Sequence, residues 1–314
     1  MKKVYFKDVA IKWLNYHKML VKESTFASYS IIMDNYLIPL MGKYNINEID
    51  NDLIQNLVIY LLEKGKKEPN IGLGENTVKN IISVLKICLK YAHKLGYRNV
   101  YILDIVYPKR NIDKRVKVLE KNNHQRLIKC IYKNMNYKNI GILLALNTGM
   151  RIGEICAIQW KDIDLKNNTI NVTKTIQRLF LKDDYGRTYT KIIITSPKSS
   201  TSIREIPLSN ELIRILKKYR VKNQEAYLLT GSEKHMEPRT YRSYYNRFLK
   251  RNKIEHIKFH SLRHTFATRC IQAGGDYKAV SEILGHATIN MTLNLYVHPQ
   301  MEEKRKCVEL INTI

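Results

Sequence analysis

A short segment near the C-terminal end of the chain has residue types and a spacing that suit a phosphate group. The segment "HSLRH" (260–264) carries His260, Arg263 and His264 within an otherwise apolar, helix-like stretch. At positions i and i+3, His260 and Arg263 share one face of a helix. Guanidinium and imidazole groups donate hydrogen bonds to phosphate oxygens. A solvated helix face would also explain three such residues, so the rest of the chain has to decide between these interpretations.

Three further segments carry side chains that could do chemistry. "TGMRIGEI" (148–155) contains an arginine and a glutamate, "SPKSSTSIREIP" (196–207) contains a lysine after a proline, and "LGHATINMTLNLYVH" (284–298) contains a histidine and a tyrosine ten residues apart. Transfer of a phosphate ester needs a nucleophile, cationic donors for the phosphate oxygens, and an acid for the leaving oxygen. The four segments together contain each of these parts.

The order and spacing of the four motifs resemble those of the tyrosine recombinases, the phage integrase family. The N-terminal half resembles the core-binding domain of that family in "IPLMGKYNINEID" (38–50) and "TVKNIISVLKICLKYAHKLGY" (77–97). The resemblance covers nearly the whole chain. It implies a site-specific recombinase that cuts and rejoins DNA through a 3′-phosphotyrosyl intermediate. Because the first core-binding helix begins near residue 5, the compact, Xer-like members without an arm-binding domain are the nearer comparison.

The resemblance also implies a role for each polar residue of the motifs. Two planar guanidinium groups hold the phosphate oxygens, since each fork binds two oxygens at once and stays protonated. The implied set is Tyr296 as nucleophile, Arg151 and Arg263 as phosphate clamp, Lys198 as general acid, His260 and His286 as further catalytic donors, and Glu154 and His264 in support.

Two alternatives stay open at these positions. "SPKSS" would also fit a plain basic turn, and Lys191 and Arg204 lie near Lys198 in the sequence. His260 and His264 have the spacing of a zinc pair, but serine occupies position 261, where a zinc protease has glutamate. We therefore expect neither a metal nor a cofactor.

Composition points to a polyanionic partner. Lys and Arg number 54 against 28 Asp and Glu, a formal charge of +26, and both residues 1–110 (net +7) and 111–314 (net +19) are basic. No apolar run is long enough to span a membrane, and charged residues interrupt the N-terminal stretch where a signal peptide would be apolar. The five cysteines form no paired motif. We expect a DNA-binding protein of the cytoplasm, with no membrane partner.

The periodicity predicts two domains that are mainly helical, with one small antiparallel sheet. Residues 1–108 form a helical, SAM-like core-binding domain with helices near 5–20, 25–37, 52–63 and 77–96. Residues 109–117 form a basic linker. Residues 118–314 form an α+β catalytic domain with helices near 122–135 and 138–148, three strands within 157–199, and helices from about 209 to a tail helix at 301–314.

The resemblance implies an assembly on double-stranded DNA. Two copies would bind inverted half-sites, and two such pairs would form a synaptic tetramer, with the tail 301–314 docking on a neighbouring copy. An accessory directionality factor would fit the same scheme. Three rival functions remain: a DNA-binding protein with a decayed active site, a type IB topoisomerase-like enzyme, and a basic protein that coats nucleic acid.

Overall fold

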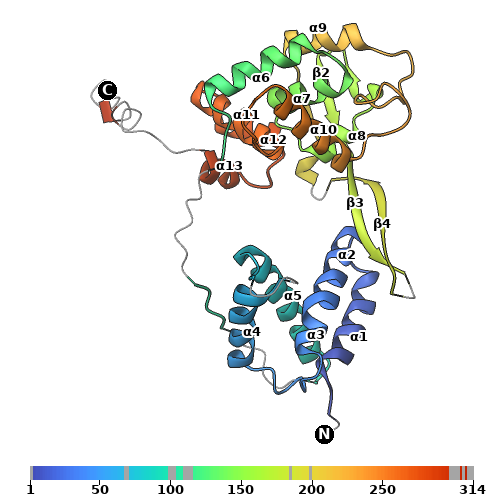
Figure 1. The fold of residues 1–314 in the computed structure, drawn as a ribbon, viewed down its shortest axis with the longest axis vertical. Helices are drawn as coiled ribbons and strands as arrows, with labels where there is room; N and C mark the ends of the chain where they lie inside the picture. Colours follow the sequence, from blue (N-terminus) through green and yellow to red (C-terminus); the bar gives the residue numbers. More distant parts are fainter. Residues whose placement is uncertain are drawn as a thin grey trace. The chain divides into compact units, whose positions relative to one another are not determined.

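The computed structural model describes residues 3–66, 71–97, 104–108, 116–183, 186–197 and 200–296, together with Arg305, Val308 and Glu309. Proximity of the Cα atoms divides the chain into two units, whose elements are labelled in Figure 1. The first comprises Met1–Ile112 and Leu179–Lys191, and the second comprises Asp113–Arg178 and Ile192–Ile314. The predicted linker, 109–117, falls mostly outside the described residues, so the predicted domain limits stay a prediction.

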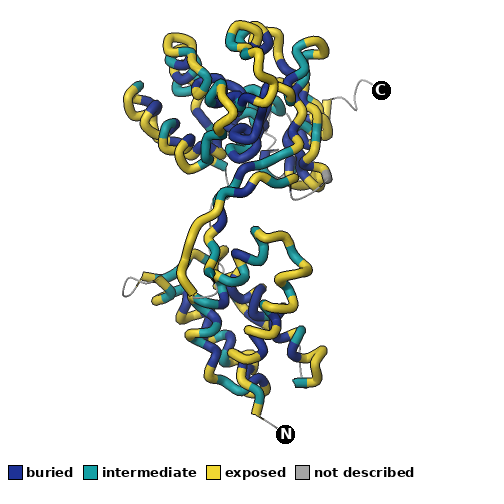
Figure 2. The backbone as a smooth tube through the Cα atoms, turned by 90° about the vertical axis from the view of Figure 1, so that its right-hand side faces the viewer, coloured by how far each residue is buried: buried dark blue, intermediate teal, exposed yellow. Residues whose placement is uncertain are grey.

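The first unit is built from helices whose apolar faces converge on one core. Figure 2 shows the buried residues gathered inside it. The helices match the predicted ranges closely because their apolar residues recur at helical spacing. In chain order they are α1 (Phe6–Lys18), α2 (Glu23–Ile32), the π-helical turn η1 (Met33–Leu37), α3 (Ile38–Met41), α4 (Asn51–Lys64) and α5 (Glu75–Lys94).

One helical path of the first unit runs past a proline. The sequence predicts a helix that ends near Pro39, but the chain continues from α2 through η1 into α3. Pro39 lies in the first turn of α3, and Gly42 is the C-cap. Proline has no backbone N–H to donate, and the wider π-helical turn η1 lies immediately before α3, where an irregular helical hydrogen-bond pattern accommodates such a residue. The helical path therefore extends to Met41.

The second unit combines helices with two small sheets. Its elements are α6 (Lys121–Lys133), α7 (Tyr137–Thr148), α8 (Ile152–Ala157), η2 (Trp160–Asp162), β1 (Ile163–Asp164), β2 (Thr169–Val172), β3 (Thr175–Lys182), β4 (Thr188–Thr195), η3 (Ser200–Ser202), β5 (Arg204–Pro207), α9 (Asn210–Tyr219), α10 (Pro238–Arg251), α11 (His260–Gln272), α12 (Tyr277–Leu284) and α13 (Ile289–Tyr296). The outer ends of β3 and β4 are grouped with the first unit.

The prediction of three strands within 157–199 is wrong in number. Four strands lie in that range, and β5 follows. β1, β2 and β5 form an antiparallel sheet in which Ile170 is paired with Ile206, whereas β3 and β4 form a separate two-stranded sheet. β1 has only two residues, and its tight turn to β2 uses a left-handed Asn168. Alternation of residue types cannot reveal a strand that short.

Helix α7 forms the buried centre of the second unit. Its sequence, "YKNIGILLALNT" (137–148), is apolar almost all round, and nearly all of its residues are buried. The helix begins at Asn136, whose side chain accepts a hydrogen bond from the Asn139 amide, and ends at a left-handed Gly149. Helix α11 packs against α7, and α12 and α13 pack against α11. The motif "HSLRH" on α11 is thereby fixed to the core.

The outer part of the β3–β4 hairpin contacts the helices of the first unit. Lys182 forms an ion pair with Asp34 at 2.8 Å, and Lys191 with Glu23 at 3.1 Å. Lys191, a neighbour of Lys198 among the basic residues of this region, is thus paired with an acid of α2.

No helix among the described residues is long and apolar enough to cross a membrane.

Candidate active site

Arg151 stands at the start of α8, immediately beyond the end of α7. Its Nη1 donates to Glu154 Oε1 at 2.7 Å, and its backbone amide donates to Glu154 Oε2 at 2.8 Å. Glu154 is almost fully buried, with 2% of its surface exposed. Burial alone would raise the pKa of Glu154, but Arg204 and Arg151 outweigh it and hold that pKa below its usual value. The carboxylate therefore stays charged and fixes the Arg151 side chain.

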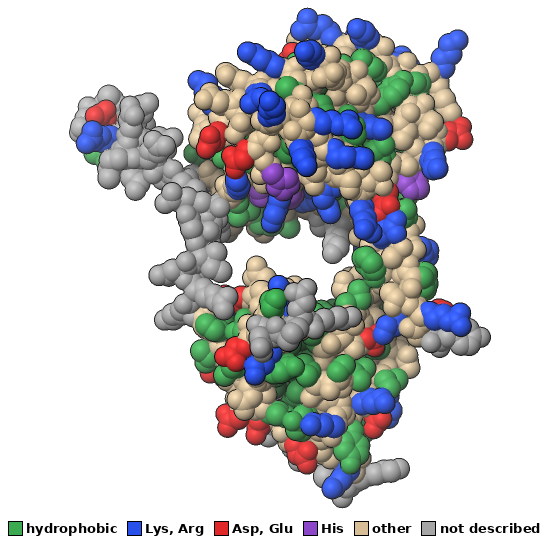
Figure 3. Space-filling view, viewed as in Figure 1, with side chains coloured by type: hydrophobic (Ala, Val, Ile, Leu, Met, Phe, Trp, Pro, Cys, Tyr) green, Lys and Arg blue, Asp and Glu red, His purple; other side chains and the backbone are tan. Residues whose placement is uncertain are grey.

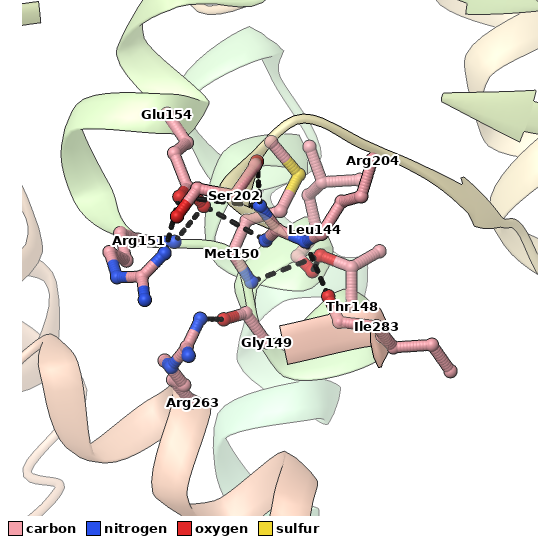
Figure 4. A network of polar contacts seen from close by, with 10 residues as sticks. All are labelled: Leu144, Thr148, Gly149, Met150, Arg151, Glu154, Ser202, Arg204, Arg263 and Ile283. Carbon is pink, nitrogen blue, oxygen red and sulfur yellow. Dashed lines mark hydrogen bonds and ion pairs between the residues drawn. The ribbon is translucent and has the colours of Figure 1, made fainter. Parts of the chain in front are cut away.

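Arg263 is the most deeply buried cation of the site. It is 2% exposed, and its Nη1 donates to the carbonyl of Gly149 at 3.0 Å, as Figure 4 shows. Burial, followed by the charge of Arg151, lowers the pKa of Arg263 to about 9. A buried guanidinium with so little carboxylate nearby gains from an anionic ligand. Arg263 thus contacts the α7–α8 turn that carries Arg151.

The nucleophile candidate, Tyr296, is held at the end of α13. Only 5% of its surface is exposed, and its hydroxyl lies 2.7 Å from Nδ1 of His264. Burial raises the pKa of Tyr296, while the nearby Arg263 and Arg151 act in the opposite direction. The hydroxyl thus lies against a histidine nitrogen and close to two arginines.

Two of the three histidines of the motifs contact this tyrosine, and the third, His260, contacts His264. His260 and His264 lie one turn apart on α11, with ring centroids 4.7 Å apart. His286 follows a left-handed Gly285, its ring stacks parallel to that of Tyr296, and its Nδ1 lies 2.8 Å from the hydroxyl of Thr292. Thr292 therefore fixes the ring of His286 and leaves the other ring nitrogen for a ligand.

Burial lowers the pKa of all three histidines and keeps His264 and His286 uncharged. It is the largest cause that lowers the pKa of His264 and of His286 to about 4, with further contributions from neighbouring cations, and it also lowers that of His260. A neutral imidazole can accept a hydrogen bond at one nitrogen and donate at the other. The site therefore combines neutral histidines with charged arginines, an arrangement that favours an anion.

A cavity of about 580 Å³ opens beside Arg151 and His260. The exposed Arg242 and Lys258 add positive charge to its rim. Figure 3 shows that Lys and Arg side chains are spread over the visible face of the second unit, where acidic side chains are few. The complete lining is Met150, Arg151, Ile152, Arg242, Asn246, His256, Lys258, Phe259 and His260.

Family models account for both parts of the chain. The model described as "Phage integrase family" matches residues 117–303, more than half of the chain. The chain belongs to the phage integrase family. A second model, "Phage integrase, N-terminal SAM-like domain", matches residues 5–62. The protein is accordingly a tyrosine recombinase, mainly helical with a small antiparallel sheet, as the four motifs predict.

Relatives of this recombinase come from bacteria and phages. It is 29% identical to a XerC-like tyrosine recombinase of Caldanaerobacter subterraneus, with 99% of this chain and 85% of the relative covered. It is 26% identical to the integrase of Staphylococcus phage L54a, with 95% and 90% covered. The solved structure of the Tn1549 transposon integrase in complex with circular intermediate DNA has a similar fold, with 23% identity, a TM-score of 0.74, and 98% and 99% covered.

Most of the recombinase residues predicted from the motifs converge in space. The structure brings Arg151, Glu154, Arg263, His264 and Tyr296 into direct or shared contacts. His260 and His286 join them through ring contacts with His264 and Tyr296. Lys198 and nearly all of the tail 301–314 lie outside the described residues, so their predicted roles stay predictions.

Sequence reasoning missed two side chains that hold this site. Arg204 hydrogen-bonds both carboxylate oxygens of Glu154, and Thr292 contacts His286. Arg204 lies in the motif "SPKSSTSIREIP", where it was a neighbour of Lys198 and had no role of its own. Thr292 lies midway between His286 and Tyr296, at a spacing that has no chemical signature. Only the folded chain places either residue at the site.

Proposed function

We propose that this recombinase cleaves duplex DNA with Tyr296 and rejoins it to a different strand. A bond forms between Oη of Tyr296 and phosphorus while the bond from phosphorus to the 5′ oxygen breaks, which leaves a 3′-phosphotyrosyl ester. The ester retains the energy of the broken bond, so attack by another 5′ hydroxyl reverses the step without a nucleotide. This chemistry fits site-specific exchange, such as the integration and excision of a mobile element or the resolution and inversion of DNA.

The same site provides an acceptor for the proton of Tyr296 and a donor for the leaving oxygen. His264 Nδ1, 2.7 Å from the Tyr296 hydroxyl, is placed to accept its proton, and the charge of a bound phosphate favours the protonated imidazole. Lys198 is proposed to give a proton to the departing 5′ oxygen, an assignment that rests on its motif alone. Arg151 and Arg263 bind the non-bridging oxygens as charge develops on them, supported by His260 and His286.

The observation that carries this proposal is the environment of the Tyr296 hydroxyl. A buried phenol lies against His264 and Arg263, and Glu154, the carboxylate that pairs with Arg151 among the described residues, is shared with Arg204. A tyrosine that only packed in a core would not need a histidine at its hydroxyl and two arginines close enough to lower its pKa. An anion with several oxygens fits this charge distribution.

Assembly on DNA is part of the proposal. The lambda integrase, which has a similar fold (16% identity, TM-score 0.63, 93% of this chain and 77% of that chain covered), has been solved as a tetramer bound to a Holliday junction. We propose that two copies of this recombinase bind inverted half-sites and that two pairs form the synapse in the cytoplasm. Residues 1–108 serve as the core-binding domain, and the tail 301–314 docks on a neighbouring copy. A directionality factor completes the scheme.

A nicked suicide duplex that carries the attachment sequence of the element tests the chemistry. With chelator present, we expect the wild-type protein to form an SDS-resistant adduct with the DNA, because the nick lets the short 5′ fragment diffuse away. The variant Tyr296→Phe keeps the ring but lacks the nucleophilic oxygen, so it should bind the duplex and form no adduct. Denaturing gels measure the adduct, and gel shifts measure binding.

Each other outcome has a clear meaning. If the wild-type protein binds the duplex and forms no adduct, a DNA-binding protein with a decayed site replaces the proposal. If the Phe variant still forms the adduct, another tyrosine is the nucleophile. If the wild-type protein relaxes supercoiled DNA at random positions, a type IB topoisomerase-like activity is the better description.

A further inference from the structure

Arg204 is a buried cation that has no role in the reaction proposed above. Its side chain is 6% exposed, and three separate segments accept its hydrogen bonds, as Figure 4 shows. Nε donates to the carbonyl of Ile283 at 2.5 Å, and Nη1 donates to the carbonyl of Ser202 at 3.0 Å. Nη2 donates to Glu154 Oε2 at 3.0 Å, and Nη1 also reaches Glu154 Oε1 at 3.4 Å. The guanidinium is therefore fully engaged by protein groups and does not present itself to a substrate.

These bonds tie together the segments that carry the catalytic side chains. Glu154 belongs to α8 with Arg151, and Ile283 lies at the end of α12, three residues before His286. The Arg204 side chain also packs beside Gly285, where an added Cβ would lie 3.2 Å from Arg204 Cδ. One residue at the start of β5 thus fixes both sides of the phosphate site.

The charge of Arg204 matters as much as its geometry. Glu154 carries one negative charge and lies between two guanidinium groups, Arg151 on one side and Arg204 on the other. Without Arg204, the carboxylate would neutralise Arg151 alone and could grip it with both oxygens. Arg151 would then bring no net charge to a phosphate, and its fork would turn toward Glu154.

We propose that Arg204 is a positioning residue of the phosphate clamp. It holds Glu154 from behind, so that Glu154 orients Arg151 through Nη1 while the rest of the Arg151 fork and its charge stay available to the scissile phosphate. The inference rests on the proposed function and extends it to a residue that touches neither DNA nor Tyr296. Arg204 acts on the reaction only through Glu154 and Arg151.

The test compares Arg204→Met with the wild-type protein on the nicked suicide duplex at saturating DNA. We expect the rate of adduct formation to fall about 10- to 100-fold, the range seen when one preorganised charge is lost, while DNA affinity changes by less than about threefold. On a duplex with a neutral methylphosphonate at the scissile position, the ratio of wild-type to variant rates should shrink to within about threefold, because less charge then needs the clamp. Arg178→Met, which removes the ion pair of Arg178 with Glu237 in the same unit, is the matched control and should react like the wild type.

A second variant provides a test if Arg204→Met folds poorly because it leaves Glu154 buried with one fewer cation. The double variant Arg204→Met/Glu154→Gln removes both charges, so Arg151 is no longer neutralised, and it should react faster than Arg204→Met. A double variant that is as slow as the single variant, or an equal defect on phosphodiester and methylphosphonate, would overturn the inference in favour of a purely structural role. An Arg204→Met protein that reacts like the wild type overturns it too, whereas a wild-type protein without any adduct refutes the proposed function instead.

Discussion

Burial shifts the pKa values of the histidines beside Tyr296 more than neighbouring charges do. His264 and His286 are neutral because the protein interior disfavours their charged forms, and neighbouring arginines add to this effect. Neutral imidazoles can exchange a proton with the Tyr296 hydroxyl or donate to phosphate without adding repulsion to Arg263. A bound phosphate would reverse part of this effect. The protonation of these histidines therefore depends on whether an anion is bound.

The depressed histidine pKa values predict how stability depends on pH. An unfolded chain takes up protons on these residues near pH 6.5, whereas the folded site resists protonation until about pH 4. The unfolded state binds more protons in this window. The contribution of these histidines to the free energy of unfolding should therefore be complete above pH 6.5 and should fall as the pH drops from 6.5 toward 4. Denaturant titrations at a series of pH values measure this slope.

The variant His286→Gln should flatten that slope, because the amide does not titrate. The exposed His256→Gln variant is the control for loss of a histidine in the same unit. A slope in His286→Gln as steep as in the wild-type protein would contradict a neutral, buried His286.

At the scale of elements, the turn between α7 and α8 sets the geometry of the clamp. Gly149 has a φ of +65°, its carbonyl accepts the Arg263 hydrogen bond, and Arg151 lies two residues further on. A Cβ at this position would lie 2.6 Å from Leu284 Cδ2 and 2.7 Å from Phe266 Cδ1. Glycine is therefore required both by the backbone and by the packing of α11 and α12 against the turn.

We predict that Gly149→Ala destabilises the second unit by about 2–5 kcal/mol, since strain at a positive φ adds to overpacking of the core. Gly274→Ala is the matched control: Gly274 also has a positive φ, but an added Cβ would meet no atom within 4 Å, so about 1–2 kcal/mol is expected. Thermal or denaturant unfolding measures both. Equal losses in the two variants would show that packing around Gly149 contributes nothing.

At the scale of the whole molecule, the formal charge of +26 should make DNA binding strongly dependent on salt. Each contact between a cation and a phosphate releases about one counterion, so an interface with six or more such contacts loses about 10³-fold in affinity between about 50 and 200 mM salt. Arg242→Ala, at the rim of the cavity beside Arg151, should lower the slope of log affinity against log salt by about one.

Lys217→Ala is the matched control for this salt measurement. Lys217 is also an exposed cation of the second unit, but it lies on α9, which does not line the cavity. We expect Lys217→Ala to leave the slope unchanged. If both variants lower it equally, the cavity has no special place in the DNA interface and the whole basic surface binds diffusely.

The sequence by itself predicted most of the helices and most of the candidate site residues that lie together in the fold. Helical spacing places His260, Arg263 and His264 on one side of α11, and motif order identifies Tyr296 and Arg151, because neighbours three or four positions apart on a helix share a face whatever the rest of the fold does. The hydrophobic run at 139–148 likewise predicts the buried helix α7. Such local relations need no knowledge of distant segments.

Only the tertiary structure decided which distant groups meet. β2 pairs with β5 across more than thirty residues, and Arg204 at the start of β5 thereby reaches Glu154 and Ile283. Lys191 is bound to Glu23, 168 residues earlier in the chain, and Thr292 contacts His286, although neither contact has a periodic signature. Contacts between distant segments depend on how several packed surfaces fit together. The residues of the whole core determine that packing, so no single motif predicts it.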